Sequence, residues 1–217
     1  MLVVFAFWLI QFAYQFYVLI PGELNGSLLR SFALSGAFLI GIALCIGPLA
    51  VLKPEWNFIF LRRTFGVAGF TLILFHIASV MAFFFKWRVD FLFFDLDPFK
   101  NALLFGIAAF LTFLPLFLTS TDWAIRRLGY NRWKSLHRLI YFAFLFSVLH
   151  FARINPALLQ NPAGYLLLTV TGVALLLELA SFVKKVRSGQ AGVGALVGAV
   201  VTLLFVVFFS LAFFFKR

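Results

Sequence analysis

The stretch that decides the fold is Thr64–Phe85, which reads TFGVAGFTLILFHIASVMAFFF. It is apolar from end to end and contains a single ionisable residue, His76. As a helix it is long enough to cross the roughly 30 Å hydrocarbon core of a bilayer. Arg62 and Arg63 stand before it and Lys86 follows it. Charges at both ends of such a run are typical of a transmembrane helix.

The rest of the chain repeats this pattern. Six further apolar runs of similar length lie at roughly 2–20, 31–52, 99–118, 136–152, 163–183 and 191–215. The chain is 64% hydrophobic and 12% charged, with a mean hydropathy of +1.08, whereas soluble domains are about half apolar and about a quarter charged. The alternation of a membrane β-barrel is absent. The sequence therefore predicts an all-α fold, a polytopic transmembrane helical bundle of seven spans.

Basic residues gather in the short segments between the runs. The segments 53–63, 122–138 and 184–187 carry 11 of the 18 lysines and arginines, and the other side carries 7. The positive-inside bias places these three segments in the cytoplasm. We therefore expect a cytoplasmic N-terminus and, after seven spans, a C-terminus outside. Because these loops and membrane lipid account for the net charge of +11, nucleic acid is not a predicted partner.

The sequence also excludes several kinds of site. The only cysteine, Cys45, lies inside an apolar run, which rules out an internal disulfide or a thiolate metal cluster. The N-terminal run lacks a basic region before it and a small-residue cleavage site, so we expect a retained helix. Neither a dinucleotide-binding glycine fingerprint nor a P-loop occurs. If electrons pass through this chain, they must come from another protein, a quinol or a bound flavin.

All three histidines lie in two of the predicted spans. His76 is in the middle of the third run, His150 near the outer end of the fifth, and His137 at its inner end. A lone histidine in a membrane helix commonly hydrogen-bonds a neighbouring helix. Axial haem ligation instead requires two imidazoles that face each other at one depth.

The depths of His76 and His150 agree. His76 lies thirteen residues after Arg63, and His150 lies thirteen residues after His137. Both distances are about 20 Å at the helical rise of about 1.5 Å per residue. Both runs are odd-numbered and therefore parallel. The sequence predicts that His76 and His150 can share one haem in the outer half of the membrane.

His137 has no histidine at its own depth. Arg62 and Arg63 stand there instead, so a second haem would need another ligand or a single-ligand iron. The two arginines are candidates for holding haem propionates or a flavin phosphate. Thirteen residues are about 3.6 turns, which would point His137 and His150 to nearly opposite sides of an ideal helix. A bend, or an unwound entry that contains His137, would bring them into line.

The segment 119–138 is the other dense polar feature. Thr119-Ser120-Thr121-Asp122 offers hydroxyls and a carboxylate, and Asp122 is expected to cap a short interfacial helix. The basic residues of this segment are Arg126, Arg127, Arg132, Lys134 and Arg138. They suit a cofactor phosphate, and they suit lipid headgroups equally well.

Several of these motifs together resemble the MsrQ/YedZ family. The matching residues are Arg62-Arg63, Gly66, His76, Thr119-Ser120-Thr121, Arg127-Leu128-Gly129, Trp133, Leu136-His137, Tyr141 and His150. The resemblance covers about residues 30–185. The family consists of haem-binding membrane subunits of the periplasmic methionine sulfoxide reductase system, within the ferric-reductase-like transmembrane superfamily.

The resemblance implies a six-helix protein of the bacterial inner membrane that binds haem b, one or two per chain, and FMN as a further cofactor. It implies electron transfer from a cytoplasmic flavin reductase or a membrane quinol to a periplasmic molybdopterin-type reductase subunit. Such a chain is an electron-transfer subunit of an oxidoreductase system rather than a complete enzyme. By motif position, His76 and His150 are the expected haem ligands, and His137 is a further candidate.

The seventh run departs from the six-helix pattern. We therefore expect two parts: a ferric-reductase-like haem-binding transmembrane domain at 1–188, and an additional C-terminal transmembrane helix at 189–217. This addition leaves other partners open, and a ferric-reductase-like cytochrome with a different acceptor is the nearest alternative. A small proton-coupled transporter, in which the histidines relay protons, is the alternative from another class. A membrane assembly factor that uses the loop 119–138 for docking is a third.

Overall fold

The computed structural model describes most of the chain. The described residues are 2–19, 21–56, 58–154 and 156–189, together with 192, 196, 199, 200, 203 and 204. Within these residues the regular structure is helical, with no β-strand, and the predicted all-α class is confirmed. The predicted seventh span, 191–215, lies almost entirely outside the described residues.

Eight α-helices make up the described bundle. They are α1 (Leu2–Tyr14), α2 (Leu24–Leu52), α3 (Ile59–Ser79), α4 (Leu103–Leu118), α5 (Asp122–Leu128), α6 (Tyr130–His137), α7 (Ile140–Ile154) and α8 (Pro162–Arg187). The π-helical turns η1 (Gln15–Leu19) and η3 (Val80–Phe84) extend α1 and α3. Short 3-10 turns lie at η2 (Pro54–Trp56), η4 (Val89–Phe93) and η5 (Pro156–Gln160).

By length and composition, five helical segments of the described chain can cross a membrane. A sixth span results if α4 and α5 count as one broken span, bent by 90° between Leu118 and Asp122. The bend turns α5 across the end of the bundle. A chain with this many apolar helices is a multi-pass membrane protein.

Helix α2 is longer than its apolar run predicted. It begins at Leu24 rather than near residue 31, because the side chain of Glu23 caps it by accepting a hydrogen bond from the Gly26 amide at 3.1 Å. It ends before Pro54, where Lys184 of α8 donates to the carbonyl of Val51 at 2.9 Å. The lysine thereby satisfies a carbonyl that the helix end leaves without a partner.

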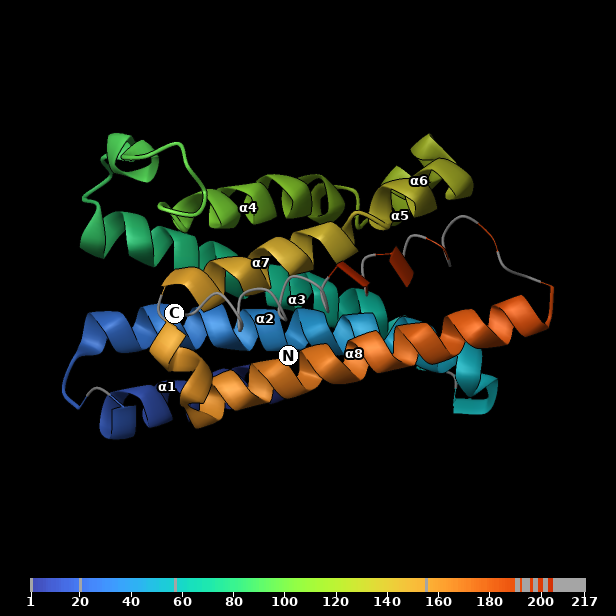
Figure 1. Ribbon diagram of the computed structural model, residues 1–217, viewed down its shortest axis with the longest axis horizontal. Helices are drawn as coiled ribbons and strands as arrows, with labels where there is room; N and C mark the ends of the chain where they lie inside the picture. The colour runs from blue at the N-terminus through green and yellow to red at the C-terminus, as the bar shows by residue number, and fades with distance from the viewer. Residues whose placement is uncertain are drawn as a thin grey trace.

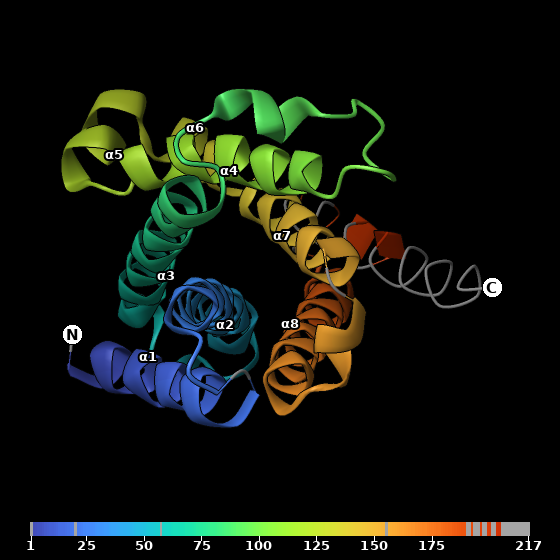
Figure 2. The same ribbon diagram turned by 90° about the vertical axis from the view of Figure 1, so that its left-hand side faces the viewer.

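Helix α2 lies at the centre of one half of the bundle, with α1, α3 and α8 packed around it (Figure 2). The contact with α3 is especially close, since a Cβ added at Gly36 would lie 2.8 Å from the Gly69 carbonyl oxygen. Small residues allow such approach between membrane helices. The other half is the pair α4 and α7, which pack against each other.

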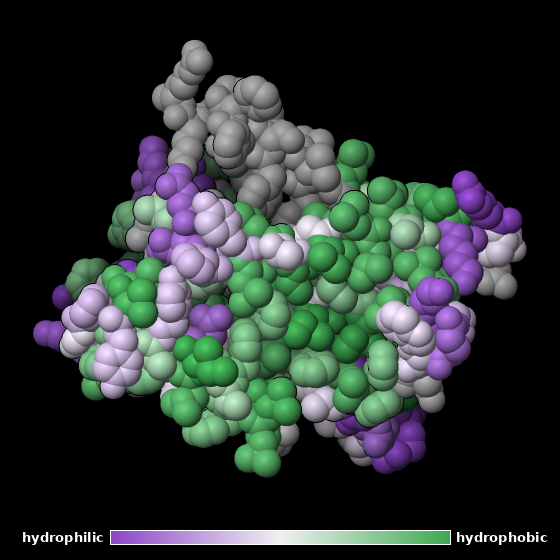
Figure 3. Space-filling model, turned by 90° about the horizontal axis from the view of Figure 1, so that it is seen from below, coloured by the Kyte–Doolittle hydropathy of each residue, from purple (hydrophilic) through white to green (hydrophobic). Residues whose placement is uncertain are grey.

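The connecting segments gather at two ends of the bundle. The basic segments 53–56 with 58–63, 122–138 and 184–187 lie together at one end, and the turns at 21–23, 85–101 and 156–161 lie at the other (Figure 1). Between the ends, the face seen in Figure 3 is a hydrophobic band flanked by hydrophilic residues. This is the surface that a bilayer requires: apolar over the hydrocarbon and polar at both interfaces.

Candidate functional site

His76 and His150 come together near the end of the bundle that carries the loop 85–101. Helix α3 supplies His76 and α7 supplies His150. The His76 imidazole lies close enough to His150 for the charge of His150 to act on it. Both side chains are half-buried in the bundle, so a charged form of either would be costly there.

The backbone holds both rings in the same way. The Nδ1 atom of His76 lies 3.0 Å from the carbonyl oxygen of Leu29, and the Nδ1 atom of His150 lies 2.9 Å from the carbonyl oxygen of Ala102. A carbonyl oxygen only accepts hydrogen bonds, so in each neutral ring Nδ1 carries the hydrogen and Nε2 carries the lone pair. Metal-ligating histidines commonly show this arrangement, because the bond at one nitrogen orients the ring and makes the other nitrogen a better donor.

Gly106 allows the His150 ring to lie against α4. A Cβ placed at Gly106 would come within 3.0 Å of Nδ1 and 3.1 Å of Cε1 of His150. The imidazole therefore packs directly on the helix backbone, and any larger residue at position 106 would push it away. The packing fixes the side of α7 from which Nε2 projects.

The helices that carry the two histidines are not packed closely on each other. Helix α3 packs on α2, and α7 packs on α4. The tethering carbonyls come from those same neighbours, because Leu29 belongs to α2 and Ala102 precedes α4. Four helices thus position two neutral imidazoles with free Nε2 atoms, which is a donor set suited to a metal that takes two axial nitrogen ligands.

His137 has a different environment at the other end of the bundle. It is the last residue of α6, and the helix is interrupted before α7 begins at Ile140. His137 itself is helical, so it does not lie in an unwound entry; the interruption follows it. Its Nε2 atom lies 3.1 Å from the Thr119 hydroxyl oxygen, and Trp133 stacks on the ring with a centroid distance of 4.2 Å.

The tautomer of His137 follows from the Thr119 hydroxyl. Thr119 donates its hydroxyl hydrogen to the Pro115 carbonyl at 2.6 Å. The hydroxyl oxygen is therefore the acceptor for His137, and Nε2 carries the hydrogen in the neutral ring. The lone pair lies on Nδ1, the opposite of the arrangement at His76 and His150.

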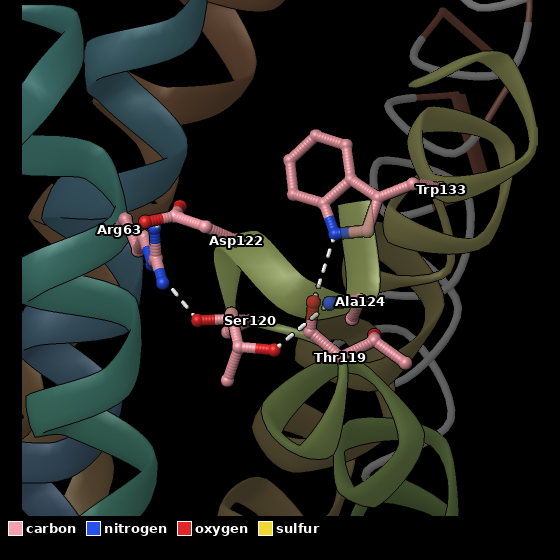
Figure 4. A network of polar contacts seen from close by, with 7 residues as sticks. Arg63, Thr119, Ser120, Asp122, Ala124 and Trp133 are labelled. Atoms are coloured by element: carbon pink, nitrogen blue, oxygen red, sulfur yellow. Dashed lines mark hydrogen bonds and ion pairs between the residues drawn. The ribbon is translucent and has the colours of Figure 1, made fainter. Parts of the chain in front are cut away.

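The segment Thr119 to Asp122 joins three helices (Figure 4). The Thr119 carbonyl accepts a hydrogen bond from the Trp133 indole at 2.9 Å. The Ser120 carbonyl accepts from Arg63 at 2.8 Å, and Asp122 forms an ion pair with the same guanidinium at 2.6 Å. The expectation that Asp122 caps α5 is wrong, because Thr121 is the N-cap and accepts the Ala124 amide at 3.1 Å. The Asp122 carboxylate instead pairs with Arg63.

Arg62 belongs to a second polar cluster, inside the bundle. Tyr141 of α7 donates its hydroxyl hydrogen to the carboxylate of Glu178 at 3.1 Å, and Arg62 also lies within hydrogen-bonding range of Tyr141. Glu178 is buried, with 6% of its surface exposed. A Cβ at Gly47 would meet the Arg62 guanidinium at 2.9 Å, so a glycine on α2 makes room for it.

The structure separates the four arginines of the predicted site. Arg62 lies close enough to His137 for its charge to act on the ring. Arg63 forms an ion pair with Asp122, the first residue of α5. Arg127 is exposed in the last turn of α5, and Arg138 is half-buried at the break after α6. Basic residues near a helix C-terminus interact favourably with the negative end of the helix dipole. Arg127 and Arg138 can therefore stabilise α5 and α6, and their charges remain available for a ligand.

Sequence reasoning missed the groups that orient the histidines. The carbonyls of Leu29 and Ala102 are backbone atoms and leave no trace in residue type. Gly106 did leave a signal, since a glycine inside an apolar helix suggests close approach. The bond between Tyr141 and Glu178 was also missed, although an acid inside a predicted span calls for a partner.

Comparisons with known proteins agree with the fold. The family described as "Ferric reductase like transmembrane component" matches residues 33–148, which is about half of the chain. No solved structure matches this chain.

Curated relatives point to one group within that family. The chain is 34% identical over 132 residues to a protein of Rhodospirillum rubrum named "Protein-methionine-sulfoxide reductase heme-binding subunit MsrQ", covering 60% of this chain and 61% of that protein. A protein of the same name from Azospira oryzae is 37% identical over 51% of this chain and 47% of its own length. The match thus spans about half to three-fifths of these two relatives.

A third protein of that name, from Rhizobium meliloti, is 31% identical over 181 residues, 81% of this chain and 82% of its own length. The match includes both histidine levels and extends over most of both chains. The chain therefore belongs to the ferric-reductase-like transmembrane family, and within it to the MsrQ family.

Proposed function

We propose that this protein is a transmembrane electron carrier that holds haem b between His76 and His150. The single observation that supports this most strongly is the shared tethering of the two rings, with each Nδ1 bonded to a backbone carbonyl and each Nε2 left free. The names of the relatives, which are haem-binding subunits, agree with it. Bound haem would supply one-electron chemistry at iron, which an apolar helical bundle cannot provide by itself.

The residues of this chain have separate tasks in that proposal. His76 and His150 hold the cofactor through Nε2, and the carbonyls of Leu29 and Ala102 orient the rings. Gly106 leaves space for the His150 ring against α4. The apolar helices around the pair exclude water, which favours neutral imidazoles and limits the reorganisation that accompanies a change of charge.

The proposed path runs across the membrane. Electrons would enter from a cytoplasmic flavin reductase or a membrane quinol and leave to a periplasmic methionine sulfoxide reductase subunit of the molybdopterin type. The names of the relatives support the link to that reductase system. The His76 and His150 pair lies toward the end opposite the basic segments. By the positive-inside rule, this supports a haem near the outer, periplasmic face of a bacterial inner membrane.

A flavin site is proposed on the basic end of the bundle. Arg63 is paired with Asp122 and Arg62 is near Tyr141. We therefore place the FMN phosphate at the exposed Arg127 of α5 and the half-buried Arg138 at the α6–α7 break. Titration of purified protein with FMN, followed by quenching of flavin fluorescence, tests this. Unchanged binding in the Arg127→Ala, Arg138→Ala double variant would contradict it.

The division into 1–188 and 189–217 also remains a proposal, together with the orientation. A reporter that is active only outside the cytoplasm, fused after Arg217, should be active if 191–215 crosses the membrane. The same reporter fused after Arg187 should be inactive. Activity of both fusions would overturn the proposed orientation.

The electron-transfer proposal is tested by the colour of the protein. Protein expressed with sufficient haem and purified in detergent should be red, and its Soret band should sharpen and shift on reduction with dithionite. A colourless protein would favour the proton-coupled transporter. A red protein that reduces ferric chelates but not the periplasmic reductase subunit would favour a ferric-reductase-like cytochrome with another acceptor.

A further inference from the structure

Asn101 is a fully buried polar residue next to the carbonyl that holds His150. None of its surface is exposed, and it stands one residue before Ala102, whose carbonyl oxygen accepts the hydrogen bond from His150 Nδ1. It lies at the junction between the loop 85–101 and α4. A buried amide at such a position needs partners for both its hydrogens and its oxygen.

The side chain of Asn101 ties the loop to the helix. Its Nδ2 atom donates to the carbonyls of Leu92 and Asp95, both at 2.9 Å. Its Oδ1 atom accepts the backbone amide of Leu103 at 3.1 Å, in the first turn of α4. One side chain therefore fixes two points of the loop and the start of the helix, on either side of Ala102.

The backbone around Ala102 has further restraints, because the Leu104 amide donates to the Asn101 carbonyl at 3.2 Å. Lys86 and Trp87 both have left-handed backbone angles, with φ of 47° and 61°, and Arg88 pairs with Asp90 at 2.6 Å on the exposed surface. Asp97 accepts the backbone amide of Asn101 at 2.8 Å. Arg153 of α7 also contacts the Phe99 carbonyl. Among the side-chain contacts of this loop, those made by Asn101 lie on both sides of the carbonyl that receives His150.

We propose that Asn101 is a positioning residue for His150, acting through the Ala102 carbonyl. By fixing that carbonyl, Asn101 sets the plane of the imidazole and the strength of the bond at Nδ1. A stronger bond at Nδ1 makes Nε2 a better donor to a metal. This inference rests on the proposed haem site. It adds that the loop 85–101 sets the orientation of His150 and has no such effect on His76.

Two variants separate this role from simple support of the fold. Asn101→Ala removes all three side-chain bonds. Asn101→Ser removes the bonds to Leu92 and Asp95 but keeps a side-chain oxygen that can accept the Leu103 amide, so it perturbs the fold less. Asp90→Asn is the matched control, because it breaks an exposed ion pair of the same loop that does not involve Asn101 or Ala102.

The measurements are made on purified full-length protein with its bound haem. We expect both Asn101 variants to shift the g-values of the low-spin ferric signal in electron paramagnetic resonance. We also expect them to raise the midpoint potential, because a weaker bond at Nδ1 makes Nε2 a poorer donor to ferric iron. Haem retention should fall by less than about 10-fold, since loss of a group that bonds a metal ligand directly costs about 10–100-fold and Asn101 acts one step further away. Asp90→Asn should change none of these.

The outcomes are distinguishable. If folded Asn101→Ser shows wild-type g-values and a wild-type midpoint potential, with only its thermal stability lowered, Asn101 supports the fold alone and the inference is wrong. If Asn101→Ala does not fold, Asn101→Ser decides. If the wild-type protein itself shows no low-spin signal, the haem site proposal fails instead, whatever the variants do.

Discussion

The histidines at the two ends of the bundle differ in which ring nitrogen makes a hydrogen bond to the rest of the protein. At one end of the bundle, His76 and His150 use Nδ1 to bond backbone carbonyls and leave Nε2 free. At the other end, His137 uses Nε2 to bond the Thr119 hydroxyl and lies stacked on Trp133. The first arrangement leaves Nε2 available to bind a metal. The second arrangement links α6 to the end of α4.

The difference shows that a histidine's position along a helix does not establish its role. His137 and His150 lie thirteen residues apart in one predicted span and would have the same status in a count of candidate ligands. Their neighbours distinguish them. A carbonyl at Nδ1 leaves the lone pair of His150 at Nε2, whereas the Thr119 hydroxyl occupies Nε2 of His137 and leaves its lone pair at Nδ1.

The largest effect should follow from loss of either proposed ligand. His76→Ala and His150→Ala should each abolish the low-spin haem signal, because bis-imidazole ligation needs both rings. Absorption and electron paramagnetic resonance spectra of the purified variants measure it. A low-spin signal that survives in either variant would break the proposed pair.

A smaller but still large effect is expected at Gly106. Gly106→Val should displace the His150 ring and convert much of the low-spin haem to a high-spin form, since even a Cβ would lie 3.0 Å from Nδ1. Gly66→Val is the matched control, because a Cβ at Gly66 of α3 meets no atom within 4 Å. Equal spectra for the two variants would show that the ring has room to move.

A change in the polar cluster of Arg62, Tyr141 and Glu178 should lower the stability of the protein without affecting the haem. Tyr141→Phe removes the hydroxyl that donates to Glu178 and should cost about 2 kcal/mol, the usual order for a hydrogen bond to a charged group. Thermal unfolding in detergent measures the cost. Tyr165→Phe, at an exposed tyrosine of α8, serves as the control. A lost low-spin signal in Tyr141→Phe would link the two levels and contradict their separation.

His137→Ala offers the most direct test of the comparison. The variant should keep the low-spin signal of the His76 and His150 pair and lose about 1 kcal/mol of stability through the bond to Thr119. Spectra and thermal unfolding of the same sample measure both. If His137→Ala loses the low-spin signal as completely as His150→Ala, the assignment of roles from the ring nitrogens is incorrect.

The smallest effect is expected for the ion pair between Arg63 and Asp122. Its side chains are 46% and 71% exposed, and exposed pairs contribute under about 1 kcal/mol. Arg63→Ala should therefore lower the unfolding temperature slightly, and less so at high salt, because salt screens exposed charges. A large, salt-independent loss would mean that the bond from Arg63 to the Ser120 carbonyl holds α5 in place.

Much of the fold could be predicted from local patterns. The described spans follow the apolar runs, and the three basic segments lie together at one end as expected. The differences arise at helix ends. Helix α2 begins earlier than its apolar run because of the Glu23 cap, and α4 is followed by a 90° bend into α5. Caps and bends depend on a few hydrogen bonds that average hydropathy does not register.

The sequence by itself determined that the chain crosses a membrane several times, and it predicted that His76 and His150 lie at one depth and His137 at another. These follow from residue type and from a constant rise per residue. Only the tertiary structure decided which nitrogen of each histidine is free, because the partners of those rings are a carbonyl on α2, a carbonyl before α4 and a hydroxyl at the end of α4. Backbone carbonyls are the same in every residue, so no pattern of side chains records which of them will meet a histidine from another helix.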